Sequence, residues 1–151
     1  MGYVKVNVDA SFHAETGDGS TGAVIRDGQG VFLAGSCSIL PHVSDAHMAE
    51  TFAMKQGLIL ANEMGFHSVQ IESDAIGVID ACSGHDRIWT QASAIYAEIF
   101  ILSGMIGSVQ FMHCNREANA AAHKLAKHAY DSNFSCNWED EPRFLSPRPC
   151  E

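Results

Sequence analysis

Tyr3-Val4-Lys5-Val6-Asn7-Val8-Asp9 is the stretch of sequence that decides the fold. Its apolar and polar residues alternate, which is the period of a half-buried strand, and we expect this strand over residues 3–12. Side chains alternate between the two faces of a strand, so the three valines share one face while Lys5, Asn7 and Asp9 share the other. The stretch therefore predicts a strand with one apolar face and a carboxylate that ends the run on its polar face.

Two further strands are expected directly after the first. Residues 17–20 predict a loop, and Gly22-Ala23-Val24-Ile25-Arg26 predicts a second strand. Asp27-Gly28-Gln29-Gly30 predicts a hairpin turn, because glycine supplies the positive φ that such turns require. A third strand is expected over residues 31–39. The first three strands should therefore form an antiparallel meander.

The rest of the chain alternates between helices and strands. A long helix is expected over residues 45–64, with Ser44 or Asp45 as its N-cap and a stripe of small residues that lets it approach a sheet closely. The remaining elements are a strand over 68–73, a short helix over 74–82, a helix over 91–103, a strand over 108–113 and a helix over 117–130. This order predicts an α/β fold in which a five-stranded mixed sheet is flanked by helices.

Length and composition limit the class of protein. The 151 residues are enough for one domain with a core, which we place at residues 1–130, followed by a C-terminal tail over residues 131–151 that is extended and packed on the domain. The formal net charge is −9 with only nine Lys and Arg, and this balance counts against tight, nonspecific binding of DNA or RNA. A strand that begins within three residues of the N-terminus suggests a domain of a longer protein.

Cysteine use and hydropathy indicate the compartment. The five cysteines are odd in number and no two have CxxC spacing, which favours free thiols in a reducing compartment. We therefore expect an intracellular location, either nuclear or cytoplasmic. No run approaches the ~20 apolar residues of a membrane helix, and no signal peptide is present, so no membrane partner is expected.

Three carboxylates stand where a folding role is not their obvious explanation. Asp9 ends a strand, Glu50 borders the packed stripe of the long helix, and Asp74 follows the strand over 68–73. Each has an ordinary alternative: Asp9 as a turn residue, Glu50 as an acid favoured by the helix dipole, and Asp74 as a helix N-cap. Carboxylates that converge repel one another, and they persist together when a divalent metal compensates their charge. The pattern points to a metal-dependent phosphodiester enzyme, or to the remains of one.

Taken in order, several stretches resemble those of a known family. The chain resembles the ribonuclease H-like domains of the type 1 ribonuclease H superfamily, specifically the retroelement-related group that is abundant in plant genomes. The resemblance covers about residues 3–130, and its matching stretches are Val6-Asn7-Val8-Asp9-Ala10-Ser11, Gly22-Ala23-Val24-Ile25-Arg26-Asp27, Ala49-Glu50-Thr51, Ile71-Glu72-Ser73-Asp74, and Arg116-Glu117-Ala118-Asn119 leading into His123-Lys124-Leu125-Ala126.

This resemblance implies an activity and a set of site residues. Asp9, Glu50 and Asp74 match three catalytic metal ligands of the family, which would hold two Mg²⁺ ions roughly 3.5–4 Å apart, with Mn²⁺ as a substitute. One ion would activate a water and the other would stabilise the leaving 3′ oxygen. The family cleaves the RNA strand of RNA–DNA hybrids and leaves 3′-hydroxyl and 5′-phosphate ends. By the same resemblance, the substrate contacts would be Ser11, His47, Arg116 and Asn119.

The chain departs from the family pattern at two places. His123 stands where the family usually has a fourth catalytic carboxylate, and imidazole is a poor ligand for the hard Mg²⁺ ion. We therefore expect weak endonuclease activity or a shift towards Mn²⁺, although His123 could also be a plain surface residue. Ala46 and His47 precede Glu50 where many active relatives carry asparagines that contact the hybrid. Arg116 and Asn119 have equally good ordinary roles in the first turn of the last helix.

Two rival functions stay open at this point. The first is a ribonuclease H-like domain that has lost catalysis and serves as a binding or interaction module of a larger plant protein, which His123 and the net charge of −9 favour. The intact carboxylates Asp9, Glu50 and Asp74 oppose it. The second is another nuclease on the same fold, such as an exonuclease or a resolvase, with a nucleic acid other than an RNA–DNA hybrid as its substrate.

Overall fold

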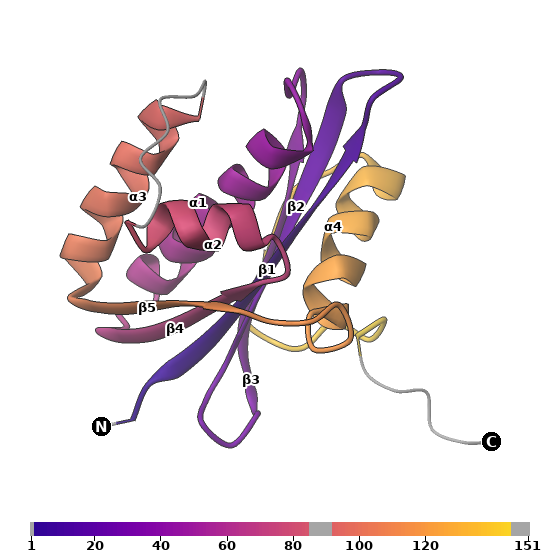
Figure 1. The fold of residues 1–151 in the computed structure, drawn as a ribbon. Coiled ribbons are helices and arrows are strands. Elements are labelled where there is room, and N and C mark those ends of the chain that lie inside the picture. The colour runs from indigo at the N-terminus through magenta and orange to yellow at the C-terminus, as the bar shows by residue number, and fades with distance from the viewer. Residues whose placement is uncertain (1, 85–91, 146–151) are drawn as a thin grey trace.

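Within residues 2–84 and 92–145, which the computed structural model describes, six strands form one mixed sheet (Figure 1). The first three strands are an antiparallel meander, as predicted, while β4 runs parallel to β1 and β5 parallel to β4. The spatial order is β5-β4-β1-β2-β3-β6. The strands are β1 (Val4–His13), β2 (Asp18–Arg26), β3 (Phe32–Leu40), β4 (Ser68–Ser73), β5 (Ser108–His113) and β6 (Cys136–Trp138).

Four helices cover the sheet in the described residues. They are α1 (Ala46–Glu63), α2 (Ile76–Cys82), α3 (Ser93–Ile106) and α4 (Ala120–Ser132). Figure 1 shows α1, α2 and α3 together on one side of the sheet and α4 on the other. This arrangement confirms the predicted α/β class with helices on both faces of a mixed sheet.

The structure corrects the number and the limits of the strands. The predicted loop over residues 17–20 is wrong, because the pairing of β1 with β2 continues to His13 opposite Asp18. Gly17, with φ +73°, makes the turn instead. The sixth strand comes from the tail, where β6 pairs antiparallel with β3 and covers its outer edge. An unpaired edge exposes backbone donors and acceptors, and the tail supplies partners for them.

The ends of the helices also differ from the prediction in places. Asp45 caps α1 as expected, since its carboxylate accepts a hydrogen bond from the Met48 amide at 2.7 Å. Asp74 does not cap α2, whose N-cap is Ala75 without a side-chain hydrogen bond. The last helix begins at Ala120 and not at residue 117, because the preceding residues form turns that the Asn115 side chain caps. The helix expected over 91–103 runs from Ser93 to Ile106, and residue 91 lies outside the described residues.

Two glycines let a helix approach the sheet closely, one on each face of the sheet. A Cβ on Gly57 of α1 would lie 2.5 Å from Cγ1 of Val8, so only glycine fits against that strand. A Cβ on Gly22 of β2 would lie 2.6 Å from the backbone nitrogen of Ala126 in α4. Gly22 is also the strand partner of Asp9. The close approach of α1 and α4 therefore occurs at the level of Asp9, which is where the candidate site lies.

The sheet separates two hydrophobic clusters, because successive side chains of β1 and β2 point to opposite faces of the sheet. Val4, Val6 and Val8 pack with α1 and α3 in the larger hydrophobic cluster. On the opposite face Val24 packs with residues of α4 and the tail, namely Leu125, Ala129 and Leu145. The tail is fixed further by Phe144, whose ring stacks on His128 of α4 at a centroid distance of 4.4 Å.

Candidate metal centre

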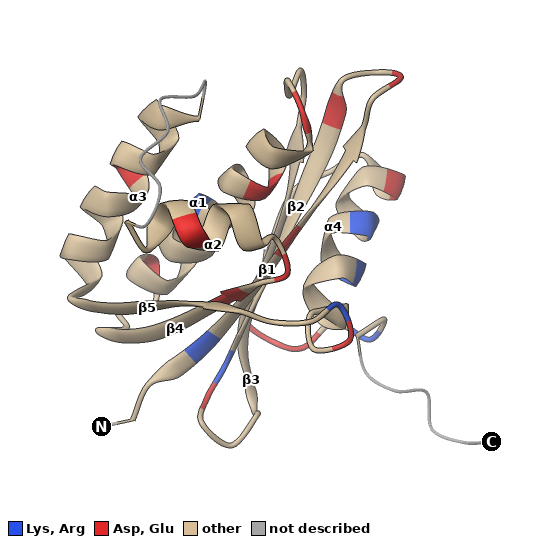
Figure 2. Ribbon diagram, in the orientation of Figure 1, with Lys and Arg blue, Asp and Glu red and all other residues tan. Residues whose placement is uncertain are grey.

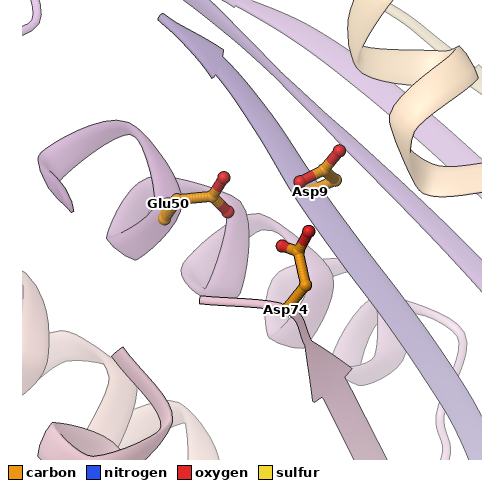
Figure 3. A group of neighbouring side chains, drawn as sticks. All are labelled: Asp9, Glu50 and Asp74. Atoms are coloured by element: carbon orange, nitrogen blue, oxygen red, sulfur yellow. The ribbon is translucent and has the colours of Figure 1, made fainter. Parts of the chain in front are cut away.

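Three carboxylates from three separate elements meet beside the end of β4. Asp9 lies on β1, Glu50 on α1, and Asp74 directly after β4. Each offers an oxygen that lies within 4.8 Å of the others. Figure 3 shows the three carboxyl groups turned toward one another. Sequence spacing alone could not place them together, because residues 9, 50 and 74 become neighbours only through the parallel pairing of β1 with β4 and the packing of α1 on both.

The cluster is electrostatically unfavourable without a cation. Burial and the charges of Asp9 and Asp74 raise the pKa of Glu50 from 4.5 to about 9. Burial, followed by the charge of Asp74, raises the pKa of Asp9, whose exposed fraction is only 5%. The Oε2 atom of Glu50 is buried and has no hydrogen-bond partner among the described residues. An unpartnered buried carboxylate oxygen costs folding free energy unless something binds it.

These residues fit a hard divalent cation. All three donors are carboxylate oxygens, which Mg²⁺ and Mn²⁺ prefer, and the buried Glu50 oxygen still lacks a partner. A cation would also offset the repulsion that raises the pKa values of Glu50 and Asp9. The cluster therefore has both the donor atoms and the uncompensated charge of a cation site.

His123 contacts the cluster from α4. Its Nδ1 lies 3.0 Å from Oδ2 of Asp9, and because a carboxylate can only accept, the imidazole donates. The side chain of His123 is 64% exposed, whereas that of Asp9 is 8% exposed. The residue at the predicted fourth position thus reaches the cluster through Asp9 and engages one of its two carboxylate oxygens.

A second polar network lies two residues away on the same face of β1. The amide of Asn7 donates to Glu72 at 3.1 Å and to the Oδ1 atom of Asn119 at 3.3 Å. Asn119, which is 1% exposed, donates in turn to the backbone oxygen of Val8 at 2.7 Å. Lys5 completes the network with an ion pair to Glu72 at 3.3 Å. Asn119, predicted as a substrate contact, therefore has its amide engaged within the protein and ties the start of α4 to β1.

Asn7 was not singled out from the sequence as a site residue. The available signal was the alternation of β1, which places Asn7 on the same face as Asp9. Its partner Asn119 lies 112 residues away, and no local pattern indicates that contact.

An open pocket of about 420 Å³ adjoins the carboxylates. Glu50 and Asp74 line it on one side, and it extends over His113 at the end of β5 and over the next three residues, Cys114, Asn115 and Arg116. Arg116 is the sole positive charge on this wall; its Nε lies 4.0 Å from Asp74, and its side chain is 95% exposed. The thiol of Cys114 faces the acids as well, since burial and the charges of Glu72 and Asp74 raise its pKa to about 11. The pocket gives a ligand direct access to the carboxylates.

The other predicted substrate contacts lie on either side of the cluster. Ser11 is two residues beyond Asp9 on β1 and bonds to the hydroxyl of Ser20 on β2. His47 is exposed on the first turn of α1 and is held by Tyr96 of α3 at 2.7 Å. Tyr96 was not anticipated from the sequence. Figure 2 shows that basic positions are few and that acidic ones occur on most elements.

The fold is that of solved ribonucleases H. The structure matches the N-terminal RNase H domain of a Mycobacterium tuberculosis protein with a TM-score of 0.81 and 21% identity, covering 87% of this chain and 96% of that one. It matches RNase H1 of Halobacterium salinarum NRC-1 with a TM-score of 0.80 and 21% identity, covering 87% and 99%. LC11-RNase H1, solved in complex with an RNA/DNA hybrid, gives 0.80 and 20%, covering 86% and 98%. The protein thus has the ribonuclease H-like fold.

The sequence profile of the reverse transcriptase-like family matches residues 7–129, so the chain belongs to that family. This finding agrees with the ribonuclease H-like resemblance of the sequence. No protein of curated function matches the chain significantly. None of the helices in residues 2–84 and 92–145 is long and apolar enough to cross a membrane.

Proposed function

We propose that this protein is a divalent-metal-dependent endonuclease that hydrolyses RNA in RNA–DNA hybrids. The observation that carries the proposal is the convergence of Asp9, Glu50 and Asp74, with one Glu50 oxygen buried and unpartnered. Membership of a ribonuclease H-like family and the fold shared with ribonucleases H support it. In the reaction, water attacks the scissile phosphorus and the P–O3′ bond breaks, which leaves a 3′-hydroxyl and a 5′-phosphate.

The proposed roles follow from where the residues lie. Asp9, Glu50 and Asp74 would hold Mg²⁺ or Mn²⁺, which when bound supplies Lewis-acid stabilisation of the phosphate charge. Arg116, exposed beside Asp74, is placed to meet a phosphate oxygen at the open side of the pocket. Ser11, two residues beyond Asp9 on the same face of β1, is placed to contact the backbone of a bound strand.

His123 is proposed to make the activity weak. It donates a hydrogen bond to Asp9 where a fourth carboxylate would add negative charge, so the cluster holds a cation less strongly. If the His123 ring turned from Asp9 to the cation, its nitrogen would suit Mn²⁺ better than Mg²⁺. The expected order of rates is therefore Mn²⁺ above Mg²⁺.

Cleavage of an end-labelled RNA–DNA hybrid in Mg²⁺ and, separately, in Mn²⁺ tests the proposal. Asp74→Asn removes one cluster charge at constant shape, and Asp80→Asn on α2 makes the same chemical change outside the cluster. RNA-strand cutting by the wild type and by Asp80→Asn, but not by Asp74→Asn, is the expected result. A folded protein that cuts in neither metal would instead favour a non-catalytic interaction module. Cutting of structured DNA without RNA would indicate another nuclease of this fold.

A further inference from the structure

Two cysteines stand directly opposite each other where the tail joins the sheet. Cys37 lies on β3 and Cys136 on β6, and the antiparallel pairing of these strands makes them partners across the ladder. Opposite residues of such a ladder point to the same face of the sheet. Both side chains accordingly pack in the same hydrophobic cluster, which includes Leu125 and Ala129 of α4. The two thiols, both free in the structure, therefore share one face and one environment.

The spacing of this pair suits a disulfide. Opposite Cα atoms in an antiparallel ladder lie about 4.5–5.5 Å apart. A disulfide joins Cα atoms that lie about 4.4–6.8 Å apart. The Cys37 thiol now donates to the Phe134 carbonyl at 3.9 Å, and the Cys136 thiol donates to its neighbour, the Asn137 carbonyl, at 3.5 Å. The backbones are thus already at bonding distance, and the two side chains have only to turn toward each other.

The two cysteines differ in how they meet an oxidant. Cys37 is 1% exposed, whereas Cys136 is only half-buried. Burial raises the pKa of the Cys37 thiol, so this thiol stays protonated and is a poor nucleophile near neutral pH. A small oxidant from solvent therefore reaches Cys136 first, and Cys37 is the buried thiol that lies opposite it.

The other cysteines of the described residues lack this arrangement. Cys82 lies on α2 and Cys114 directly after β5, and neither element carries a second cysteine. Cys150 lies outside the described residues. The ladder of β3 and β6 thus singles out one pair.

A bond at this place would join the tail to the sheet covalently. β6 has only three residues and pairs with the outer edge of β3. Beside it, the Ile39 amide donates to the Ser135 hydroxyl at 3.0 Å, and the rings of Trp138 and Phe144 meet at a centroid distance of 5.9 Å. A short strand near a chain end opens more readily than the core strands. Its opening would uncover the edge of β3, and an uncovered edge pairs with other chains.

We propose that Cys37 and Cys136 form a reversible disulfide under oxidising conditions, and that this bond fixes the tail strand β6 on the edge of β3. In a reducing compartment the pair rests as two thiols, and a disulfide there forms transiently. The inference does not depend on the proposed function, since none of the residues involved belongs to the carboxylate cluster.

Hydrogen peroxide is the oxidant that balances the step. Its O–O bond breaks as it converts the Cys136 thiol to a sulfenic acid, and one water leaves. The Cys37 sulfur then attacks the sulfenic sulfur, the S–O bond breaks, and a second water leaves as the S–S bond forms. The two sulfurs together lose the two electrons that the peroxide gains. A small dithiol such as dithiothreitol reverses the step and becomes a disulfide itself.

Mass spectrometry of the peroxide-treated protein tests the pairing. The intact wild type should lose the mass of two hydrogen atoms, and its peptides should contain one link, between Cys37 and Cys136. Dithiothreitol should restore the original mass. Cys136→Ser and Cys37→Ala should each fail to form the link, whereas Cys82→Ala, which removes a cysteine elsewhere, should form it as the wild type does.

Thermal unfolding and hydrogen exchange test what the bond holds. Each protein is compared with itself before and after oxidation, so any cost of the substitution cancels. The wild type should gain roughly 5–15 °C in melting temperature, as a bond that closes a long loop stabilises the folded chain. The amides of β6 should exchange at least about tenfold more slowly. Cys136→Ser should show neither change.

The opposite results are equally specific. A main link that joins either cysteine to Cys150, or that joins two chains, overturns the inference. So does oxidation of Cys136 to a sulfinic acid while Cys37 remains a thiol. A Cys37–Cys136 bond that leaves the exchange of the β6 amides unchanged overturns the part that concerns the tail. Cleavage of an RNA–DNA hybrid, or its absence, bears only on the proposed function.

Discussion

Two buried polar clusters lie two residues apart on β1, and they differ in whether their hydrogen-bonding groups are satisfied. Around Asn7, the amide contacts Glu72 and Asn119, and Asn119 reaches the Val8 carbonyl. Around Asp9, three carboxylates converge, and one oxygen of Glu50 is buried without a partner. In the first cluster the polar groups bond to one another within the protein. In the second cluster the negative charges are not compensated, and one buried acceptor has no partner among the described residues.

The difference separates a folding tie from a ligand site. A satisfied buried network contributes to stability and to a unique arrangement of the elements it joins, here α4 and β1. A cluster of like charges with an orphaned oxygen costs folding free energy, so its presence is better explained by something it binds. We therefore expect substitutions around Asn7 to lower mainly the stability of the protein. Substitutions around Asp9 should lower mainly the binding of its ligand.

The largest expected effect is that of Asp9→Asn on activity. The change removes one cluster charge and leaves His123 only a neutral amide oxygen as acceptor, so cleavage of the hybrid should fall by at least about 1000-fold, since metal-based stabilisation of charge is worth several kcal/mol. The rise in melting temperature that Mg²⁺ or Mn²⁺ produces should vanish as well. Hybrid cleavage and thermal unfolding with and without metal measure the two effects. A variant that keeps the metal-induced rise would show that the cation binds elsewhere.

The next largest effect should be that of Asn119→Ala on stability. The change removes the Asn119 hydrogen bonds to Asn7 and Val8, leaves a buried carbonyl without a partner, and opens a cavity. We expect the free energy of unfolding to fall by about 2–4 kcal/mol. Denaturant unfolding of the metal-free protein measures it, and Asn115→Ala, which removes an exposed cap, should cost less than about 1 kcal/mol. Equal losses in both variants would contradict the view of Asn119 as the central tie.

The two clusters also differ in how far the sequence predicted them. Alternation along β1 placed Asp9 on the polar face, and the small residues of α1 predicted the close packing seen at Gly57. These signals are local, because they depend on the period of one element. The pairing of Asn7 with Asn119 spans 112 residues, and His47 meets Tyr96 only because α3 packs on α1. Nor could the sequence show that β3 leaves an edge for β6, since that depends on the finished sheet.

A smaller effect is expected from Glu50→Gln, and it depends on pH. The folded-state pKa of Glu50 is about 9 against an ordinary value of 4.5. Stability from this group is therefore fully present below about pH 4.5 and is lost as the pH rises toward 9. The metal-free wild type should lose several degrees of melting temperature between pH 5 and 9 relative to Glu50→Gln. Thermal unfolding of both proteins across this range measures the difference, and parallel curves would mean that the cluster does not carry the repulsion we infer.

The smallest effect, and the one that tests the departure from the family pattern, is that of His123→Asp on metal affinity. The variant replaces a donor to Asp9 with a fourth carboxylate, so Mg²⁺ should bind about fivefold to tenfold more tightly, or about 1–1.4 kcal/mol. The gain for Mn²⁺ should be smaller, because an imidazole that turned from Asp9 to the cation would already suit that ion. Melting temperature against metal concentration measures both affinities. Lys124→Ala is the control, because it lowers the net charge by the same one unit on the neighbouring residue. An equal gain in metal affinity there would mean that His123→Asp acts only through the net charge of the protein. A gain in metal affinity confined to position 123, with faster hybrid cleavage in Mg²⁺, would mean that Asp9, Glu50 and Asp74 form a cation site that lacks only a fourth carboxylate.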